Sequence, residues 1–189
     1  MKICVYAASS NEVSRVYINA AEEFGKRLAE KGHTLVYGGG ANGLMGAVAR
    51  GAYSAKGEII GVAPSFFNVD GVLFENCTEF IYTKTMRERK QIMEDISDAF
   101  VMLPGGIGTF DEFFEILTLR QLGQHAKPIA ILNTNGYYDN LFNMLTTSIN
   151  HGFMSDICLK LCPPFTSSDK LLFYLENHTS ELQLYKNLK

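Results

Sequence analysis

Short apolar runs alternate with longer amphipathic segments along almost the whole chain, and this alternation limits the folds that the chain can adopt. The apolar runs have the length of buried strands, and the amphipathic segments have the spacing of helices. The expected strands are 2–8, 34–37, 58–63, 79–83, 99–103, 128–132 and 160–162. The expected helices are 13–31, 43–55, 86–96, 109–122, 138–151 and 168–177. We therefore predict an α/β fold, a doubly wound and mainly parallel sheet with helices on both faces.

The chain has 189 residues, the size of one ordinary domain, and it shows no repeat and no long linker. We therefore expect a single domain over residues 1–189. The stretch 64–78 has the weakest periodicity, and we expect a long loop there that covers the functional site.

The formal net charge of −3 argues against a general nucleic-acid surface, which would carry a basic excess. No apolar run is long enough to cross a membrane, and the chain opens on a strand pattern without a leader, so we expect a cytoplasmic protein. Cys158 and Cys162 are separated by three residues, without a second ligand pair nearby. We interpret them as buried packing residues and expect no metal site.

Three turns each follow an expected strand and precede an expected helix: residues 8–10, 38–43 and 104–109. In doubly wound sheets, ligands bind beyond the carboxyl ends of the strands, at the point where the strand order reverses. Glycine-rich turns at helix N-termini let backbone N–H groups approach a phosphate closely. The three turns are therefore the expected ligand-binding rim.

The second turn matches a dinucleotide fingerprint, since Gly38, Gly40 and Gly43 have the G-x-G-x-x-G spacing. That fingerprint also needs an acidic residue at the end of the next strand, and the sequence there is Gly-Val-Ala-Pro-Ser. NAD binding is therefore disfavoured, and a mononucleotide or sugar phosphate fits better. The alternative is that Gly43 and Gly46 only allow close helix packing.

The third turn places Glu112 near the start of a helix, where a carboxylate would repel a bound phosphate. Two interpretations stay open: Glu112 is catalytic, or Thr109 and Glu112 form a capping box. The cations Arg87, Arg89 and Lys90 also lie at a helix start, which opposes the helix dipole. They form either a solvated surface or a binding site for an anionic ligand.

Together these motifs resemble the LOG family, the cytokinin riboside 5′-monophosphate phosphoribohydrolases, over roughly residues 2–165. The resemblance is carried by GGG-x-x-GLMG at 38–46, M-x-x-RK at 86–90, and PGG-x-GT-x-x-E at 104–112. Automated labels often call such proteins lysine decarboxylases, yet no motif here identifies the Schiff-base lysine that a pyridoxal enzyme needs. Differences from the family at Ala8, Arg87 and Leu119 leave the preferred base open.

The resemblance implies a Rossmann-like fold, a homodimer with active sites near the interface, and no cofactor. It implies hydrolysis of a nucleoside 5′-monophosphate to free base and ribose 5-phosphate, with Arg89 and Glu112 as catalytic residues. The expected substrate contacts are Ser9, Gly39, Gly40, Gly43, Met86, Lys90, Gly105, Gly106, Ile107, Gly108, Thr109 and Thr118. A non-catalytic nucleotide-binding or carrier module is the alternative, and the presence of both Arg89 and Glu112 favours the enzyme.

The expected helix 86–96 places Arg89, Ile92, Met93 and Ile96 on neighbouring parts of one face. This apolar stripe packs either on the chain's own sheet or on a symmetric partner. The resemblance favours the partner, in a two-fold dimer.

Overall fold

The computed structural model describes residues 1–179, and its strands form one parallel sheet in the order β4-β3-β2-β1-β5-β6-β7. The strands are β1 (Lys2–Tyr6), β2 (Thr34–Tyr37), β3 (Ile59–Pro64), β4 (Glu79–Thr83), β5 (Ala99–Met102), β6 (Ile129–Leu132) and β7 (Pro164–Phe165). The α-helices are α1 (Arg15–Glu30), α2 (Gly43–Ser54), α3 (Met86–Ile96), α4 (Ile107–Gln121), α5 (Asp139–Asn150), α6 (Ile157–Leu161) and α7 (Ser168–Glu176).

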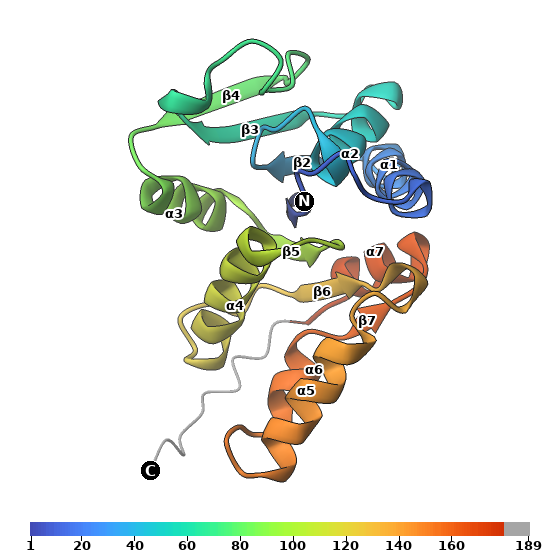
Figure 1. Ribbon diagram of the computed structural model, residues 1–189, viewed down its shortest axis with the longest axis vertical. Coiled ribbons are helices and arrows are strands. Elements are labelled where there is room, and N and C mark those ends of the chain that lie inside the picture. The colour runs from blue at the N-terminus through green and yellow to red at the C-terminus, as the bar shows by residue number, and fades with distance from the viewer. Residues whose placement is uncertain (180–189) are drawn as a thin grey trace.

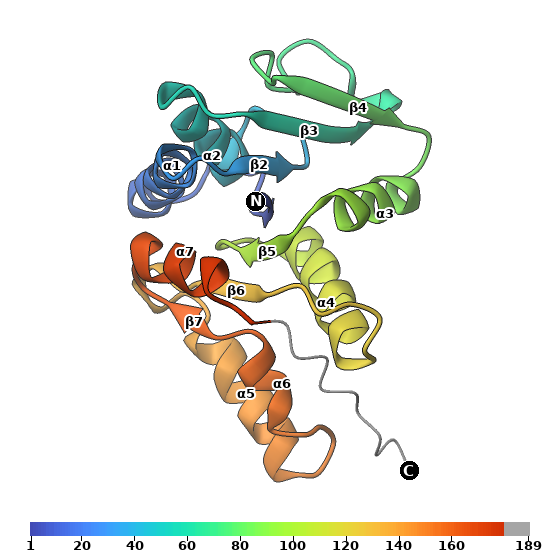
Figure 2. The ribbon, with the colours of Figure 1, turned by 180° about the vertical axis from the view of Figure 1, so that it is seen from behind.

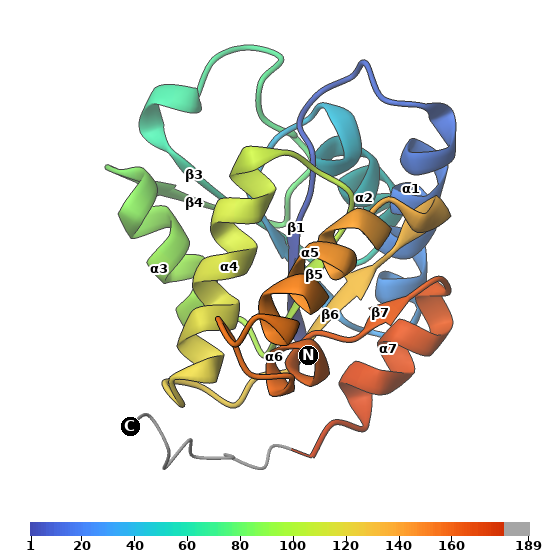
Figure 3. The same cartoon turned by 60° about the horizontal axis from the view of Figure 1, so that its bottom comes forward.

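Successive side chains of a strand point to opposite faces, and β1 shows how the two faces of the sheet are covered. Ile3 and Val5 join a core with buried residues of α1, α2 and α7. Cys4 and Tyr6 join a second core with buried residues of α3 and α4. Figures 1 and 2 show these helix groups on opposite sides of the strands, and Figure 3 shows them with β1 between them. The predicted doubly wound sheet is confirmed.

The chain order reverses at β1, which pairs in parallel with β2 on one side and β5 on the other. From β1 the chain moves outward to β4, then returns to β5 and moves outward to β7. Tyr6 lies in register with Met102, so β1 and β5 end at the same level. The switch point expected for ligand binding therefore lies where the turns after β1 and β5 leave the sheet.

The strand expected at 160–162 is wrong. Residues 157–161 form the short helix α6, and the seventh strand follows at Pro164–Phe165. In α6 the Nζ of Lys160 lies 2.9 Å from Asp156 Oδ2, an i,i+4 pair typical of a helix. Cys158 and Cys162 have the same spacing and are both buried, as expected for packing residues. A three-residue segment is too short to separate the helix period from the strand period, which explains the error.

None of the helices among residues 1–179 combines the length and the apolar character that crossing a lipid bilayer requires.

Glycines bring α1 and α2 close together. A Cβ added at Gly51 would lie 1.9 Å from the Glu22 carbonyl oxygen, and one at Gly25 would lie 2.0 Å from the Val48 carbonyl oxygen. Both neighbours are backbone atoms, so a side chain at either position would force the helices apart.

We expect Gly51→Ala to lower the free energy of unfolding by about 1–3 kcal/mol, because the added methyl group overpacks the contact between α1 and α2. Gly108→Ala is the matched control, since a Cβ there meets no heavy atom within 4 Å. Urea denaturation measures both. An equal loss of stability in the two variants would contradict the packing argument.

Candidate active site

Backbone hydrogen bonds bring the three predicted turns together. The Ala8 N–H donates to the Pro104 carbonyl oxygen at 3.2 Å, and the Met45 N–H donates to the Ala8 carbonyl oxygen at 3.1 Å. The Gly43 N–H donates to Asn11 Oδ1 at 2.8 Å. The turns after β1, β2 and β5 therefore form one continuous rim at the switch point.

Gly43 and Gly46 have packing roles in this rim. Gly43 has a φ of +58°, and a Cβ there would lie 2.6 Å from the carbonyl oxygens of Ala8 and Ser10. A Cβ at Gly46 would lie 1.8 Å from the Ala41 carbonyl oxygen. Backbone atoms therefore exclude a side chain at both glycines, in agreement with a packing role for each.

The expected loop 64–78 lies against the second turn. After a short 3-10 helix, η1 (Ser65–Phe67), it forms an antiparallel bridge between Leu73 and Gly40. The Ala41 N–H donates to the Val72 carbonyl oxygen, and the Phe74 N–H donates to the Gly39 carbonyl oxygen, both at 2.9 Å. This loop therefore covers the glycine turn from one side.

Arg89 is buried at the rim, so it is not part of a solvated surface. Its Nε donates to the Val62 carbonyl oxygen at 3.0 Å, and its Nη1 donates to Glu112 Oε1. A Cβ at Gly38 would lie 2.1 Å from Arg89 Nη2, so the guanidinium occupies the space that a side chain at position 38 would fill. Three segments thus fix the orientation of one guanidinium.

Thr85 caps the start of α3, one turn before Arg89. The Thr85 hydroxyl accepts from the Glu88 N–H at 3.1 Å, and Glu88 Oε2 accepts from the Lys84 N–H at 2.7 Å. This cap was not predicted, although Thr85-x-x-Glu88 before an apolar-periodic helix is an ordinary sequence signature of one.

The capping interpretation of Thr109 and Glu112 is wrong. Helix α4 begins at Ile107 with Gly106 as its N-cap, so Thr109 lies inside the helix and is buried. Glu112 lies in the second turn, points at Arg89, and is 12% exposed. Burial raises the pKa of the Glu112 carboxyl, and the charge of Arg89 opposes this rise. A glutamate whose pKa is perturbed in this way is suited to proton transfer.

The glycine turn before α4 is tied down from its outer side. Tyr138 OH donates to the Leu103 carbonyl oxygen at 2.7 Å, and Tyr137 OH donates to the Gly105 carbonyl oxygen at 2.8 Å. A Cβ at Gly106 or Gly108 meets no heavy atom within 4 Å, so the space before the helix is open. The first N–H groups of α4 have no carbonyl partner within the helix and favour an anion there.

Lys90 lies outside this rim, in an ion-pair cluster. Its Nζ lies 3.1 Å from Asp111 Oδ2 and also contacts Glu115 Oε2. Asp111 and Glu115 were not predicted to take part, although their i,i+4 spacing on either side of Glu112 places two more carboxylates on the same helix. Lys90, Ile107 and Thr118 line a hollow of about 600 Å³ that runs along α4.

The remaining predicted contacts have different surroundings. Ser9 is exposed on the first turn, and Met86 is 42% exposed at the start of α3. Gly39 has a φ of +77°, and the ring of Phe80 lies where its Cβ would stand. The structure therefore divides the predicted residues between the rim around Glu112, the hollow along α4, and an exposed border.

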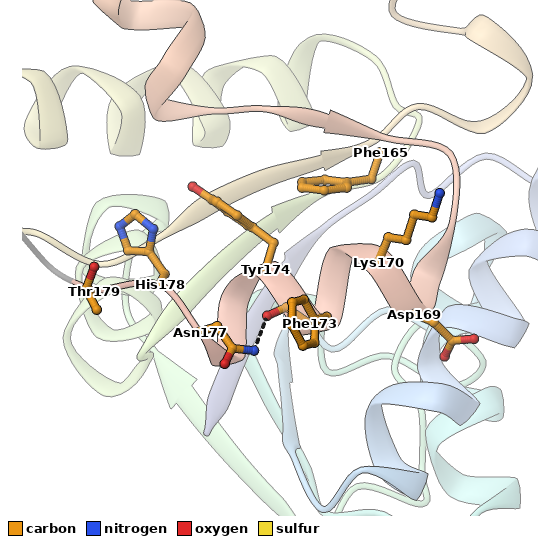
Figure 4. A pocket seen from close by; sticks show the side chains of 8 residues that line it. All are labelled: Phe165, Asp169, Lys170, Phe173, Tyr174, Asn177, His178 and Thr179. Atoms are coloured by element: carbon orange, nitrogen blue, oxygen red, sulfur yellow. Dashed lines mark hydrogen bonds between the residues drawn. The ribbon is translucent and has the colours of Figure 1, made fainter.

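A hollow of about 640 Å³ lies elsewhere, beside α7 and the edge strand β7. Figure 4 shows Phe165, Tyr174 and His178 at this hollow, where Asn177 Nδ2 donates to the Phe173 carbonyl oxygen at 2.8 Å. None of the predicted site residues lines it. Among residues 1–179, no group of three or more His, Cys, Asp or Glu side chains could hold a metal ion.

Comparisons with known proteins give the family. A family model described as "Possible lysine decarboxylase" matches residues 45–175. The cytokinin riboside 5′-monophosphate phosphoribohydrolase LOG2 of Arabidopsis thaliana is 35% identical over 94% of this chain and 83% of its own length. The chain belongs to the LOG family. The rice enzyme LOG is 36% identical over 97% of this chain and 76% of its own length.

Solved structures give the same fold for this LOG-family chain. The molybdenum cofactor binding protein of Rippkaea orientalis superposes with a TM-score of 0.70 and 22% identity, over 93% of this chain and 94% of that one. The molybdenum cofactor carrier protein of Chlamydomonas reinhardtii also gives 0.70 and 22%, over 93% and 95%. At this identity the likeness shows the Rossmann-type fold alone.

We expect Arg89 and Glu112 of this LOG-family chain to contribute to the free energy of unfolding as a coupled pair. Arg89→Met or Glu112→Leu alone leaves a buried charge without its partner and should cost about 3–5 kcal/mol. The double variant carries neither charge, so its loss of stability should be far smaller than the sum of the losses in the two single variants. Urea denaturation of the four proteins measures the coupling energy.

The control for this cycle is Lys26→Met with Glu30→Leu, an exposed i,i+4 pair on α1 with Nζ and Oε1 3.8 Å apart. Its coupling should not exceed about 0.5 kcal/mol. Additive losses at Arg89 and Glu112 would mean that the pair does not hold α3 and α4 together.

Proposed function

We propose that this protein hydrolyses the N-glycosidic bond of a nucleoside 5′-monophosphate, releasing free base and ribose 5-phosphate. The observation that carries the proposal is the largely buried Glu112 carboxylate, oriented by Arg89 beside the open N-terminus of α4. A pure phosphate-binding site gains nothing from a carboxylate there. The LOG relatives named as phosphoribohydrolases support the same reaction, with a cytokinin riboside 5′-monophosphate or AMP as substrate.

The proposed reaction breaks the bond between the ribose C1′ and the base nitrogen, whose electron pair leaves with the base. A water oxygen forms the new bond to C1′. One water proton passes to the Glu112 carboxylate and then to the departing base, and the other stays on the new hydroxyl. The ionised carboxylate also stabilises the positive charge that develops on the ribose.

Arg89 serves this reaction by holding the carboxylate. Its guanidinium bonds to Glu112 and to the Val62 carbonyl, which keeps its charge directed at the carboxylate and away from a developing sugar cation. Glu112 and Arg89 are therefore the proposed catalytic pair.

The phosphate of the substrate binds, in this proposal, at the N-terminus of α4. The N–H groups from Gly106 to Thr109 lie at the positive end of the helix dipole, next to the open space that the glycines leave. Gly105 beside this N-terminus, Lys90 and Thr118 in the hollow along α4, and Ser9, Gly39, Gly40, Gly43 and Met86 of the neighbouring segments complete the proposed substrate contacts. The reaction needs no cofactor.

A non-catalytic carrier on the same fold is the second candidate. The structural likeness to molybdenum cofactor carrier proteins fits a carrier, but at 22% identity it speaks for the fold alone. The Arg89–Glu112 pair favours the enzyme, and turnover separates the two functions.

We expect the purified protein to release free base from AMP and from a cytokinin riboside 5′-monophosphate without added metal or NAD. Adenosine should be a poor substrate, because phosphate binding positions the reacting bond. Chromatography of the released base measures both rates. Equal turnover of AMP and adenosine would contradict the phosphate site at α4.

Glu112→Gln is the control for catalysis, since it keeps the shape of the side chain but cannot accept the water proton. Turnover of AMP should fall by about 10²-fold or more, the scale of general base catalysis. Binding of AMP without turnover in the wild-type protein would favour the carrier.

We further propose that the protein acts in the cytoplasm as a homodimer of single-domain chains covering residues 1–189. The apolar stripe of α3 does not need a partner, because Met93 is fully buried in the chain's own core and Ile92 and Ile96 pack against it. The dimer is supported instead by exposed apolar side chains on α4 and α5. Ile107 is 82% exposed and Met144 is 63% exposed, and α5 has no buried residue of its own.

Light scattering at micromolar concentration should therefore give twice the chain mass of 21.0 kDa. Met144→Lys should shift the mass toward the monomer, because it places a charge in the proposed interface. Val16→Lys is the control, since Val16 is 46% exposed and belongs to α1, which lies on the opposite side of the sheet from α4. A monomeric wild-type protein with full activity would refute the dimer.

A further inference from the structure

Gly38 lies where the pairing of β2 with β3 stops, and the side chain of Arg89 reaches the sheet at this point. The register of the two strands ends at Tyr37 and Gly61. The carbonyl oxygen of the next residue in β3, Val62, accepts from Arg89 Nε at 3.0 Å. The guanidinium therefore lies beside the end of the ladder of strand hydrogen bonds.

The position of this guanidinium requires the missing side chain of Gly38. A Cβ built on Gly38 would lie 2.1 Å from Arg89 Nη2 and 3.2 Å from Arg89 Cζ. The guanidinium cannot move aside freely, because its Nε donates to Val62 and its Nη1 donates to Glu112. A side chain at position 38 would therefore have to weaken at least one of these two bonds.

Space, and not backbone conformation, explains the glycine at position 38. Gly39 and Gly43 have φ values of +77° and +58°, in the left-handed region, whereas the φ of Gly38 lies outside that region. The first glycine of a dinucleotide loop serves a tight turn toward the pyrophosphate. In this chain, the first glycine of the G-x-G-x-x-G spacing makes room for an arginine instead.

Met45 bounds the same space from helix α2. Its terminal methyl carbon, Cε, would lie 2.7 Å from the Cβ built on Gly38. The Met45 N–H donates to the Ala8 carbonyl oxygen at 3.1 Å, which fixes the first turn of α2 beside the rim. We call the space bounded by Gly38 and Met45 the arginine socket.

We propose that Gly38 and Met45 are positioning residues, whose socket orients the Arg89 guanidinium toward Glu112. The proposal rests on the proposed hydrolysis only for its effect on turnover, because the orientation of Arg89 is a property of the free protein. The two residues act on the reaction through the ion pair and not through a contact with the substrate.

Nitrogen-15 NMR of the arginine side chains tests the socket in the substrate-free protein, with Arg89→Met used to assign the Nε–H signal. The Nε–H of Arg89 should exchange slowly with water in the wild-type protein, because it is buried and hydrogen-bonded. Gly38→Ala should raise the exchange rate by about tenfold, the scale of one lost hydrogen bond. Met45→Ala should raise it by less, because it removes one side of the socket and keeps the space at Gly38.

Gly51→Ala is the matched control for the exchange measurement. It makes the same chemical change, but its Cβ would lie 1.9 Å from the Glu22 carbonyl oxygen of α1 and not against Arg89. It should lower the stability of the fold and leave the exchange of the Arg89 Nε–H unchanged at a temperature where the variant stays folded. Equally fast exchange in Gly51→Ala and Gly38→Ala would overturn the proposal.

The kinetics of AMP hydrolysis are the second readout. In Gly38→Ala, kcat should fall by about 10²-fold, the scale for displacing a reacting group by about 1 Å. KM should change less, because the proposed phosphate site at the N-terminus of α4 lies outside the socket. A loss of kcat with unchanged exchange of the Arg89 Nε–H would mean that Gly38 contacts the substrate, and it would overturn the proposal.

Failure of the proposed function looks different. A wild-type protein without turnover, whose Arg89 Nε–H still exchanges faster in Gly38→Ala, would refute the hydrolysis and leave the socket standing. Met45→Ala changes a half-buried side chain, so it keeps the test available if Gly38→Ala fails to fold. Unchanged exchange in Met45→Ala would then refute the socket.

Discussion

The buried ion pair between Arg89 and Glu112 is the interaction on which the site depends. Moving two charges out of water costs several kcal/mol per ion, so the pair persists only with good geometry and further hydrogen bonds. The Val62 carbonyl in β3 supplies one such bond, and the missing side chain at Gly38 supplies the space. Strand β3, the turn after β2, and helices α3 and α4 therefore all meet at one guanidinium and one carboxylate.

The alternation of apolar runs and amphipathic segments was sufficient to predict the doubly wound sheet, because each element is long enough to show its own period. The prediction failed where the pattern was too short or ambiguous. Leu161 and Cys162 belong to the end of a helix and not to a strand. The last strand comes later in the chain, at Pro164–Phe165. Thr109 and Glu112 have the spacing of a capping box, but the helix starts two residues before Thr109, with a glycine as its cap.

The candidate site was predictable as a set of segments but not as a set of contacts. Strand ends and glycine turns indicate which loops share a rim, since parallel strands carry their carboxyl ends to one edge. The sequence does not show that Arg89 is buried, because its partners Val62 and Glu112 come from other elements. Lys90 likewise has the motif position of a ligand contact, and only the packing of α3 on α4 places it among Asp111 and Glu115.

The two tyrosines that follow β6 have a consequence for how a ligand would bind. Tyr138 and Tyr137 hold the carbonyls of Leu103 and Gly105, while Asn133 Oδ1 accepts from the Tyr138 backbone N–H at 2.8 Å. The glycine loop is thus ordered during folding, before any anion arrives, and the entropic cost of ordering it is removed from the binding step. Association should then resemble the docking of a rigid ligand into a preorganised cradle, with a rate set by diffusion and orientation rather than by loop closure.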